Sequence, residues 1–158
     1  MDSKEFGLVA AQQLFQVEDL HYGFWDSPSE ATLNNWKSAQ EKHTNFLFDY
    51  IFDNVKDIKE SKLLDIGCGI GITTKKLLEK GYNVDGLVPY SWMADYARKI
   101  ISKSQNSNQI YECNFEDFPV SSLKGKYQLV FFSESFQYVN MNLTFKILEK
   151  ILKKHNTI

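Results

Sequence analysis

A short apolar run that leads into three alternating glycines is the feature that most constrains the fold of this chain. Residues 63–66 read Leu-Leu-Asp-Ile, a pattern typical of a buried β-strand, and Gly67, Gly69 and Gly71 follow directly. Glycine lets a backbone turn sharply and approach a ligand more closely than a Cβ would allow. A helical pattern over residues 73–80 comes next, so the loop is expected to open a helix whose free N–H groups face the same place.

The glycine spacing argues against a dinucleotide-binding fingerprint. Such fingerprints carry G-x-G-x-x-G and an acid at the end of the second strand. Here Gly71 follows Gly69 after a single residue, and Val88 stands at the end of the second predicted strand. A nucleotide-binding oxidoreductase is therefore the least favoured of three functional hypotheses.

Strands and helices alternate along the second part of the chain. The predicted strands cover residues 63–66, 82–88, 110–113 and 129–132. The predicted helices cover residues 73–80, 91–104 and 142–154, with a polar turn at 105–108. This alternation predicts a parallel sheet in an α/β fold. Five side chains of the last helix are expected to face inward: Leu143, Ile147, Leu148, Ile151 and Leu152.

Two helices are expected before the sheet. The first covers residues 3–17, and its expected apolar side consists of Phe6, Val9, Ala10, Leu14 and Val17. The second is expected to begin at Ser27, which can cap it, with Pro28 in the first turn and Glu30 completing a capping box. It is expected to end near Val55.

The composition is that of an ordinary globular protein. The chain has 43% hydrophobic and 24% charged residues, which argues against disorder, and its net charge of −2 gives no electrostatic case for nucleic acid or an anionic membrane surface. No apolar run approaches the roughly 18 residues that span a bilayer. Cys68 and Cys113 have neither C-x-x-C nor Cys/His spacing, so we expect no disulfide framework, no metal site and a cytoplasmic location.

Residues 63–71 resemble the glycine-rich loop of class I S-adenosylmethionine-dependent methyltransferases. Residues 84–99 are similar to the second strand and following helix of that family, and residues 114–120 to the loop after its third strand. Residues 127–139 resemble its fourth strand and the loop that faces substrate. Residues 21–26, His-Tyr-Gly-Phe-Trp-Asp, resemble the leading segment of the family's small-molecule branch.

This resemblance implies the fold class and the domain organisation. We expect an α/β fold with a Rossmann-like parallel sheet of the class I methyltransferase type, preceded by N-terminal helices and lacking the family's last strands. The 158 residues are expected to form a single domain. Within it, residues 1–58 form a helical cap and residues 59–158 the cofactor-binding core.

The resemblance also implies S-adenosylmethionine as the cofactor, wrapped by the loop backbone and oriented by Asp65. Most family members carry an acid that accepts both ribose hydroxyls at the position of Val88, which can accept nothing. Tyr90 and Ser91 can serve instead, or cofactor binding has decayed; Val88→Asp is expected to tighten binding if the site is otherwise intact. Asp85 has the opposite strand parity and is expected to point elsewhere.

In the third motif, Asn114 matches the acceptor of the adenine amino group, and Phe115 either lies against the adenine ring or is a core aromatic. Cys68 is expected to be a small filler of the loop rather than a nucleophile. The predicted cofactor-binding residues are Tyr22, Asp65, Gly67, Cys68, Gly69, Gly71, Val88, Pro89, Tyr90, Asn114, Phe115 and Ser133.

The loop after the fourth strand supplies the predicted acceptor side, because carboxyl ends of parallel strands carry ligands in such sheets. Glu134 is predicted to be catalytic, accepting a proton from a nucleophile or holding it, and is otherwise a surface carboxylate. His21 is the second predicted catalytic residue, with a structural histidine as the alternative. The predicted substrate contacts are Trp25, Gln137 and Tyr138.

The leading hypothesis is methyl transfer from S-adenosylmethionine to a small-molecule acceptor, in which the protein mainly aligns the reactants. The alternative is an inactive binding or scaffold subunit that needs a partner chain. Strand 127–132 is expected at an open sheet edge with no later segment to pair with it, a hazard that proteins cover. A second protomer, a partner subunit or a folded-back helix can cover it, or the chain is a shortened form. We expect a homodimer or heteromer with residues 127–154 in the interface.

Overall fold

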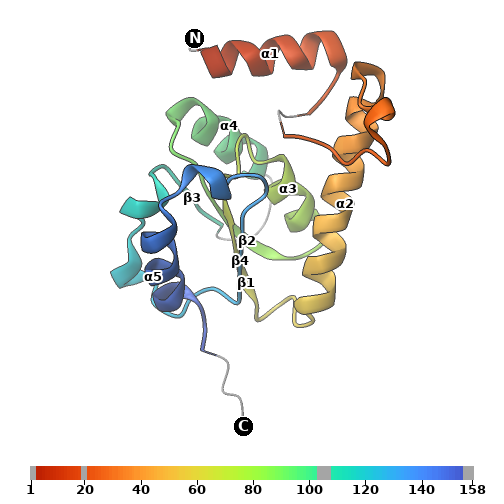
Figure 1. Cartoon of the computed structure of the whole chain (residues 1–158). Coiled ribbons are helices and arrows are strands. Elements are labelled where there is room, and N and C mark those ends of the chain that lie inside the picture. Colours follow the sequence, from red (N-terminus) through yellow and green to blue (C-terminus); the bar gives the residue numbers. More distant parts are fainter. Residues whose placement is uncertain (1–2, 19–20, 103–107, 155–158) are drawn as a thin grey trace. The chain divides into compact units, whose positions relative to one another are not determined.

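The chain forms two compact units, Met1–Asn54 and Val55–Ile158. The computed structural model describes residues 3–18, 21–102 and 108–154 (Figure 1). In these described parts no helix combines the length and the apolar character that a bilayer crossing requires.

The N-terminal unit is helical. Helix α1 spans Ser3–Phe15, and two short 3₁₀ turns, η1 (Pro28–Glu30) and η2 (Leu33–Asn35), precede helix α2 (Trp36–Asn54). Helix α2 ends next to Val55, where its end was predicted. Its buried side chains follow one another at intervals of one, four, four and three residues, as on one face of an amphipathic helix: Ala39, Gln40, Thr44, Phe48 and Ile51.

The predicted helix start at Ser27 is wrong. The Ser27 hydroxyl lies 2.9 Å from the Ser29 hydroxyl and caps no backbone N–H. Extended backbone at Thr32 (φ −121°, ψ 159°) separates the two 3₁₀ turns, and the α-helix begins only at Trp36. Neither of these described turns buries a residue, so no packing favours a longer helix there.

Helix α1 buries a different side from the one predicted. Leu8 and Ala11 are buried, whereas Phe6 and Leu14 are exposed. Val17 is buried as predicted, but it lies beyond the helix, which ends at Phe15 before the left-handed Gln16 (φ 55°).

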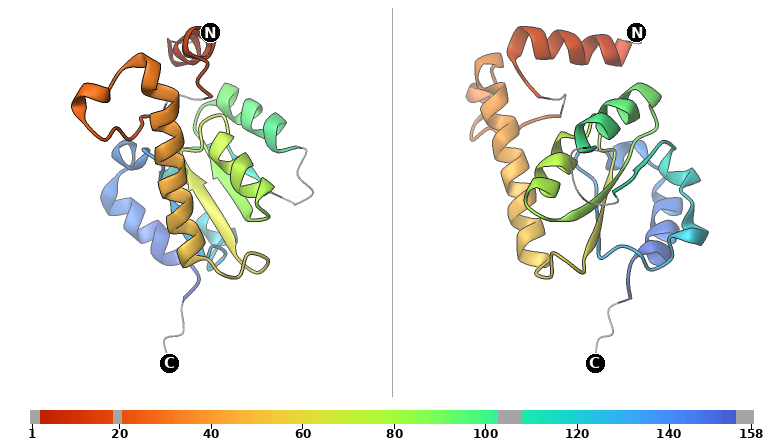
Figure 2. Two further views of the ribbon diagram at one scale, coloured as in Figure 1. Left: turned by 90° about the vertical axis from the view of Figure 1, so that its right-hand side faces the viewer. Right: turned by 180° about the vertical axis from the view of Figure 1, so that it is seen from behind.

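The second unit is a parallel sheet between two layers of helices. Strands β1 (Lys62–Ile66), β2 (Asn83–Leu87), β3 (Ile110–Tyr111) and β4 (Leu129–Phe131) lie in the order β3-β2-β1-β4, and every pair is parallel. Helices α3 (Ile72–Glu79) and α4 (Ser91–Ile101) lie on one face and α5 (Met141–Ile151) on the other (Figures 1 and 2). The predicted α/β fold is confirmed.

The strand order fixes where this sheet can hold a ligand. The chain moves outward from β1 to β2 and β3, and then returns to place β4 on the other side of β1. The connections therefore diverge beside the carboxyl end of β1, and such a switch point is where open α/β sheets bind ligands.

One core cluster lies between the sheet and α5. Its buried members are Leu64, Ile66, Leu87, Phe115, Phe118, Leu123, Tyr127, Ile147 and Ile151. Burying large aliphatic and aromatic side chains is worth about 1.5–3 kcal/mol each. This core holds β1 and β2, and thereby the loops at their carboxyl ends.

Several element boundaries differ from the predicted ones. Strands β3 and β4 end earlier, and most of the predicted turn at 105–108 lies outside the described residues. Helix α5 buries Thr144, Ile147 and Ile151, whereas Leu143, predicted to face inward, is exposed.

Strand β4 lies at the edge of the sheet, as predicted, but this chain begins to cover its outer side. The N–H of Tyr127 donates to the carbonyl of Ile151 at 3.0 Å, and the N–H of Lys153 donates to the carbonyl of Tyr127 at 2.8 Å. Tyr127 and Leu152 thus form a parallel bridge. The expectation that no later segment pairs with this strand is wrong at Tyr127, because the end of α5 returns the chain to the start of β4.

Candidate functional site

The carboxyl end of β1 turns into α3 through three left-handed glycines. The φ angles of Gly67, Gly69 and Gly71 are 80°, 56° and 85°, a region that other residues enter only with strain. The N–H groups of Gly67 and Cys68 donate to the carbonyl of Leu87 at 2.8 and 3.0 Å. These two hydrogen bonds tie the loop to the carboxyl end of β2.

The three glycines meet different surroundings. A Cβ on Gly67 would lie 2.3 Å from the Cβ of Ser135, and a Cβ on Gly71 would lie 3.0 Å from the Cβ of Ala97 in α4. Both glycines are therefore required by packing. A Cβ on Gly69 would meet no atom within 4 Å in the described structure. Gly69 is thus the loop position where a ligand can approach the backbone.

Asp65 lies at the base of this loop. It is 1% exposed, and its Oδ2 accepts a hydrogen bond of 2.8 Å from Thr74 Oγ1 in the first turn of α3. Thr74 is itself fully buried, so the carboxylate orientation is fixed. Thr74 was not predicted as a site residue. Its position in the first turn of the helix, directly after the glycine loop, could have indicated this role.

The Cys68 side chain packs behind the loop. It is buried, and a Cβ on Gly86 of β2 would lie 2.8 Å from its Sγ. Burial, and secondly the Asp65 charge, raise the pKa of the Cys68 thiol well above its ordinary value. The thiol therefore stays neutral and fills space, as the sequence analysis expected, and only the Cys68 backbone can face a ligand.

Val88 also turns into the core. It is 2% exposed, and its N–H donates to the carbonyl of Tyr111 at 3.0 Å. A carboxylate at this position would be buried, so the expectation that Val88→Asp tightens cofactor binding loses its physical basis. Pro89 is exposed and Tyr90, which precedes α4, is half-buried.

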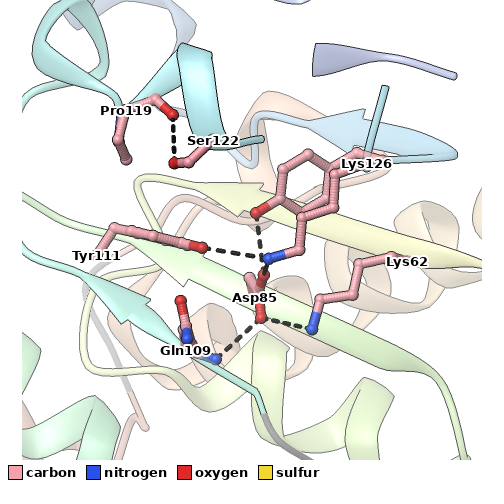
Figure 3. Close-up of polar contacts among 8 residues, drawn as sticks. Lys62, Asp85, Gln109, Tyr111, Pro119, Ser122 and Lys126 are labelled. Carbon is pink, nitrogen blue, oxygen red and sulfur yellow. Dashed lines mark hydrogen bonds and ion pairs between the residues drawn. The ribbon is translucent and has the colours of Figure 1, made fainter. Parts of the chain in front are cut away.

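Asp85 points to the opposite face of the sheet, as its strand parity predicted, and joins a buried polar network (Figure 3). Its carboxylate lies 2.8 Å from Lys62 Nζ and 3.2 Å from Lys126 Nζ. It also accepts hydrogen bonds from the Gln109 N–H at 2.9 Å and from the Tyr127 hydroxyl at 2.9 Å. The network holds strands together and takes no part in the candidate site.

In the loop after β3, Asn114 is exposed and Phe115 is buried. Asn114 Nδ2 donates to Asp117 Oδ2 at 3.2 Å. The Phe115 ring is 1% exposed and lies between Phe118 and Phe132, with ring centroids 5.9 and 5.7 Å apart. Phe115 is therefore a core aromatic, the second of the two roles considered for it, and its ring does not face open space beside the loop.

The loop after β4 comes next to the glycine loop, because β4 pairs with β1. Ser133 and Glu134 are half-buried, and Glu134 has a left-handed φ of 59°. The hydroxyl of the buried Ser135 donates to the carbonyl of Ile66. Gln137 is exposed, and its Nε2 donates to the carbonyl of Glu134 at 2.6 Å.

The second predicted substrate contact in this loop, Tyr138, is 80% exposed. The sequence placed Ser135 in the substrate-side loop but did not predict its hydrogen bond to Ile66, since nothing in the local pattern indicates a contact with a residue so distant in the chain.

The remaining predicted site residues, His21, Tyr22 and Trp25, belong to the N-terminal unit. The carbonyl of His21 accepts hydrogen bonds from Gln40 Nε2 at 2.6 Å and from Trp36 Nε1 at 3.4 Å. Tyr22 is 71% exposed and Trp25 is half-buried. Their role at the site stays a prediction.

Comparison with known proteins gives a family and a relative. A family model described as a methyltransferase domain matches residues 63–155. Protein arginine N-methyltransferase 6 of Danio rerio is 32% identical over 89 residues, which are 56% of this chain and 26% of that protein. The chain thus spans about a quarter of the length of this curated relative.

Solved structures share the fold at low identity. Geranyl diphosphate C-methyltransferase from Streptomyces coelicolor A3(2) matches 92% of this chain and 56% of its own, with a TM-score of 0.69 and 19% identity. A Galdieria sulphuraria protein, provisionally assigned as a sarcosine dimethylglycine methyltransferase, matches 97% of this chain and 56% of its own, with a TM-score of 0.76 and 17% identity. The [4+2]-cyclase SpnF matches 96% of this chain and 57% of its own, with a TM-score of 0.63 and 13% identity. The chain spans just over half of these proteins, and the likeness to them shows the fold alone.

Proposed function

This chain belongs to the family of methyltransferase domains, and we propose that it binds S-adenosylmethionine at the glycine loop and transfers its methyl group to a small-molecule acceptor. The observation that carries the proposal is the open backbone at Gly69, beside a buried Asp65 that Thr74 holds in place. Structural neighbours crystallised with S-adenosylhomocysteine and with sinefungin support the choice of cofactor.

The residues around the loop fit this cofactor. Gly69 leaves space for the methionine part against the backbone, and the Asp65 carboxylate can orient it directly or through water. Since Val88 is buried and apolar, the ribose hydroxyls would be held by Tyr90 or Ser91. When bound, the cofactor supplies the electrophilic methyl group on a sulfonium sulfur.

The adenine amino group would donate to the side-chain oxygen of Asn114. The side-chain nitrogen of Asn114 already donates to Asp117. The backbone of the glycine loop and the residues Cys68, Pro89 and Ser133 would complete the cofactor contacts. Positioning is the main contribution of such a site, since methyl transfer needs an in-line approach of the nucleophile.

On the acceptor side, Glu134 would accept a proton from the nucleophile or hold it by a hydrogen bond. Gln137 and Tyr138, which are exposed in the same loop, would contact the acceptor. His21, Tyr22 and Trp25 would close over the cofactor, with His21 as a second proton acceptor. The geranyl diphosphate methyltransferase neighbours support a small molecule as acceptor.

One observation favours a second candidate function, a binding or scaffold subunit without activity. Val88 offers no acceptor to the ribose, and losing such charge-assisted hydrogen bonds costs about 1.5–3 kcal/mol. In that case a partner chain would supply the missing function.

We also propose that the chain associates, as a homodimer or with a partner subunit, through residues 127–154. In the described structure Leu152 forms a bridge with Tyr127, two residues before β4, and β4 itself has no neighbouring strand on its outer side. Sedimentation of dilute protein measures this, and a monomer at micromolar concentration would contradict it. The unpaired Cys68 and Cys113 fit a reducing compartment, and we propose the cytoplasm.

The activity is tested by measuring S-adenosylhomocysteine formed from S-adenosylmethionine by purified protein. We expect formation with the low-molecular-weight fraction of a cell extract and none with the protein fraction of the same extract. Formation with the protein fraction alone would overturn the small-molecule acceptor. Formation with neither fraction, by protein that binds the cofactor, would favour the inactive binding subunit.

A further inference from the structure

We propose that Ser135 is a positioning residue that couples the filling of the cofactor site to the placement of Glu134. The inference rests on the proposed function, because it takes the glycine loop as the cofactor site. It concerns the contact between two loops that follow adjacent strands, β1 and β4.

The first observation is a buried hydrogen bond between these loops. The Ser135 hydroxyl donates to the carbonyl of Ile66, the residue directly before Gly67. Ser135 is 9% exposed, so little water competes for this hydroxyl. The partners lie 69 positions apart in the chain, and the hydrogen bond therefore joins two loops that meet only in the folded structure.

The second observation is the fit between Ser135 and Gly67. A Cβ on Gly67 would lie 2.3 Å from the Cβ and 2.8 Å from the Oγ of Ser135. Real Cβ atoms do not approach other atoms so closely, so the missing side chain of Gly67 makes room for Ser135. A shift of the backbone at Gly67 is therefore transmitted directly to Ser135.

The third observation is the strained backbone of Glu134, the neighbour of Ser135. Its φ of 59° is unfavourable for a residue with a side chain, and such strain persists only where the surroundings impose it. Three hydrogen bonds do so here. Besides the bond to Ile66, Gln137 Nε2 donates to the carbonyl of Glu134 at 2.6 Å, and the N–H of Tyr138 donates to the carbonyl of Ser135 at 3.0 Å.

These contacts give the coupling its direction. The backbone of the glycine loop, with Gly67 and the preceding Ile66, would be restricted by a cofactor held against the open backbone of Gly69. Because Ser135 is hydrogen-bonded to Ile66 and packed on Gly67, the restriction extends to its neighbour Glu134. The predicted proton acceptor is then fixed when the cofactor is bound and looser when the site is empty.

Amide hydrogen exchange, measured with and without S-adenosylhomocysteine, tests the coupling without a known acceptor. In the wild-type protein we expect the ligand to slow exchange in residues 67–71 and also in 133–138. In Ser135→Ala we expect slowing in 67–71 to remain and slowing in 133–138 to be lost, with exchange there about twofold to tenfold faster. Ser122→Ala is the matched control, because its hydroxyl also donates to a carbonyl, that of Pro119 at 3.0 Å, in another loop of the sheet unit.

The pattern of exchange separates the possible failures. Slowing in 67–71 without slowing in 133–138 of the wild-type protein overturns the coupling and leaves the cofactor site intact. The coupling is also overturned if the ligand still slows exchange in 133–138 of Ser135→Ala, or if that slowing is lost in Ser122→Ala too. No slowing in 67–71 of the wild type overturns the proposed function and the coupling with it. The wild-type arm decides even if Ser135→Ala does not fold.

Discussion

The Asp85 carboxylate has four polar partners among the described residues of the sheet unit. Its carboxylate is fully buried and meets Lys62 at the start of β1, Lys126 and Tyr127 before β4, and the Gln109 N–H before β3 (Figure 3). Asp85 itself belongs to β2, so all four strands or the segments that lead into them converge on one charge. Burial, and secondly the charge of Asp85, raise the pKa of the Tyr127 hydroxyl far above its ordinary value, so that it remains a donor.

Replacing this carboxylate tests how much the network stabilises the sheet. We expect Asp85→Asn to lower the free energy of unfolding by about 1–3 kcal/mol, because it leaves two partly buried amines without their counter-charge. Urea unfolding measures the change. The control is Glu79→Gln, which removes an exposed partner of Lys75 at 3.3 Å and should cost no more than about 0.5 kcal/mol. Similar losses in the two variants would contradict this account of Asp85.

At the scale of elements, sequence patterns located most helices and strands but misplaced some of their ends. Sequence patterns identified β1, β2 and α3 to within one residue at each end, because short runs of buried residues and neighbouring glycines delimit them. The start of α2 was misplaced because Ser27 and Glu30 form a capping pattern in a segment that buries nothing. A cap stabilises only a helix that packing also favours, and packing is not visible in a short sequence pattern.

Ser27 and Asn140 give a matched test of this point, because both have the sequence of a capping residue but only Asn140 caps an α-helix. Asn140 Oδ1 accepts from the Leu143 N–H at 3.2 Å and caps α5, so we expect Asn140→Ala to cost about 1 kcal/mol of stability. Ser27 caps no helix, and we expect Ser27→Ala to change stability little. Urea unfolding followed by circular dichroism measures both, and an equal cost for the two would show that Ser27 does cap a helix in solution.

At the scale of the whole molecule, the topology and the glycine loop could be predicted from sequence, whereas the contacts that complete the candidate site could not. The parallel sheet follows from the alternating elements, and the position of the fourth strand at the sheet edge follows from the family resemblance. The Ser135–Ile66 hydrogen bond and the left-handed Glu134 depend on two segments meeting in space. The burial of Val88 likewise depends on packing.

The central claim, that the glycine loop binds the cofactor, is tested most directly by calorimetric titration of S-adenosylhomocysteine into the wild type, Gly69→Val and Gly125→Val. Both glycines are left-handed, with φ of 56° and 62°, and a Cβ on either would meet no atom of the described structure within 4 Å. The two variants therefore carry similar backbone strain, but only the Gly69 side chain would occupy the proposed cofactor space. We expect the wild type and Gly125→Val to bind alike and Gly69→Val not to bind. Equal binding by Gly69→Val and the wild type, or no binding by the wild type, would contradict the account.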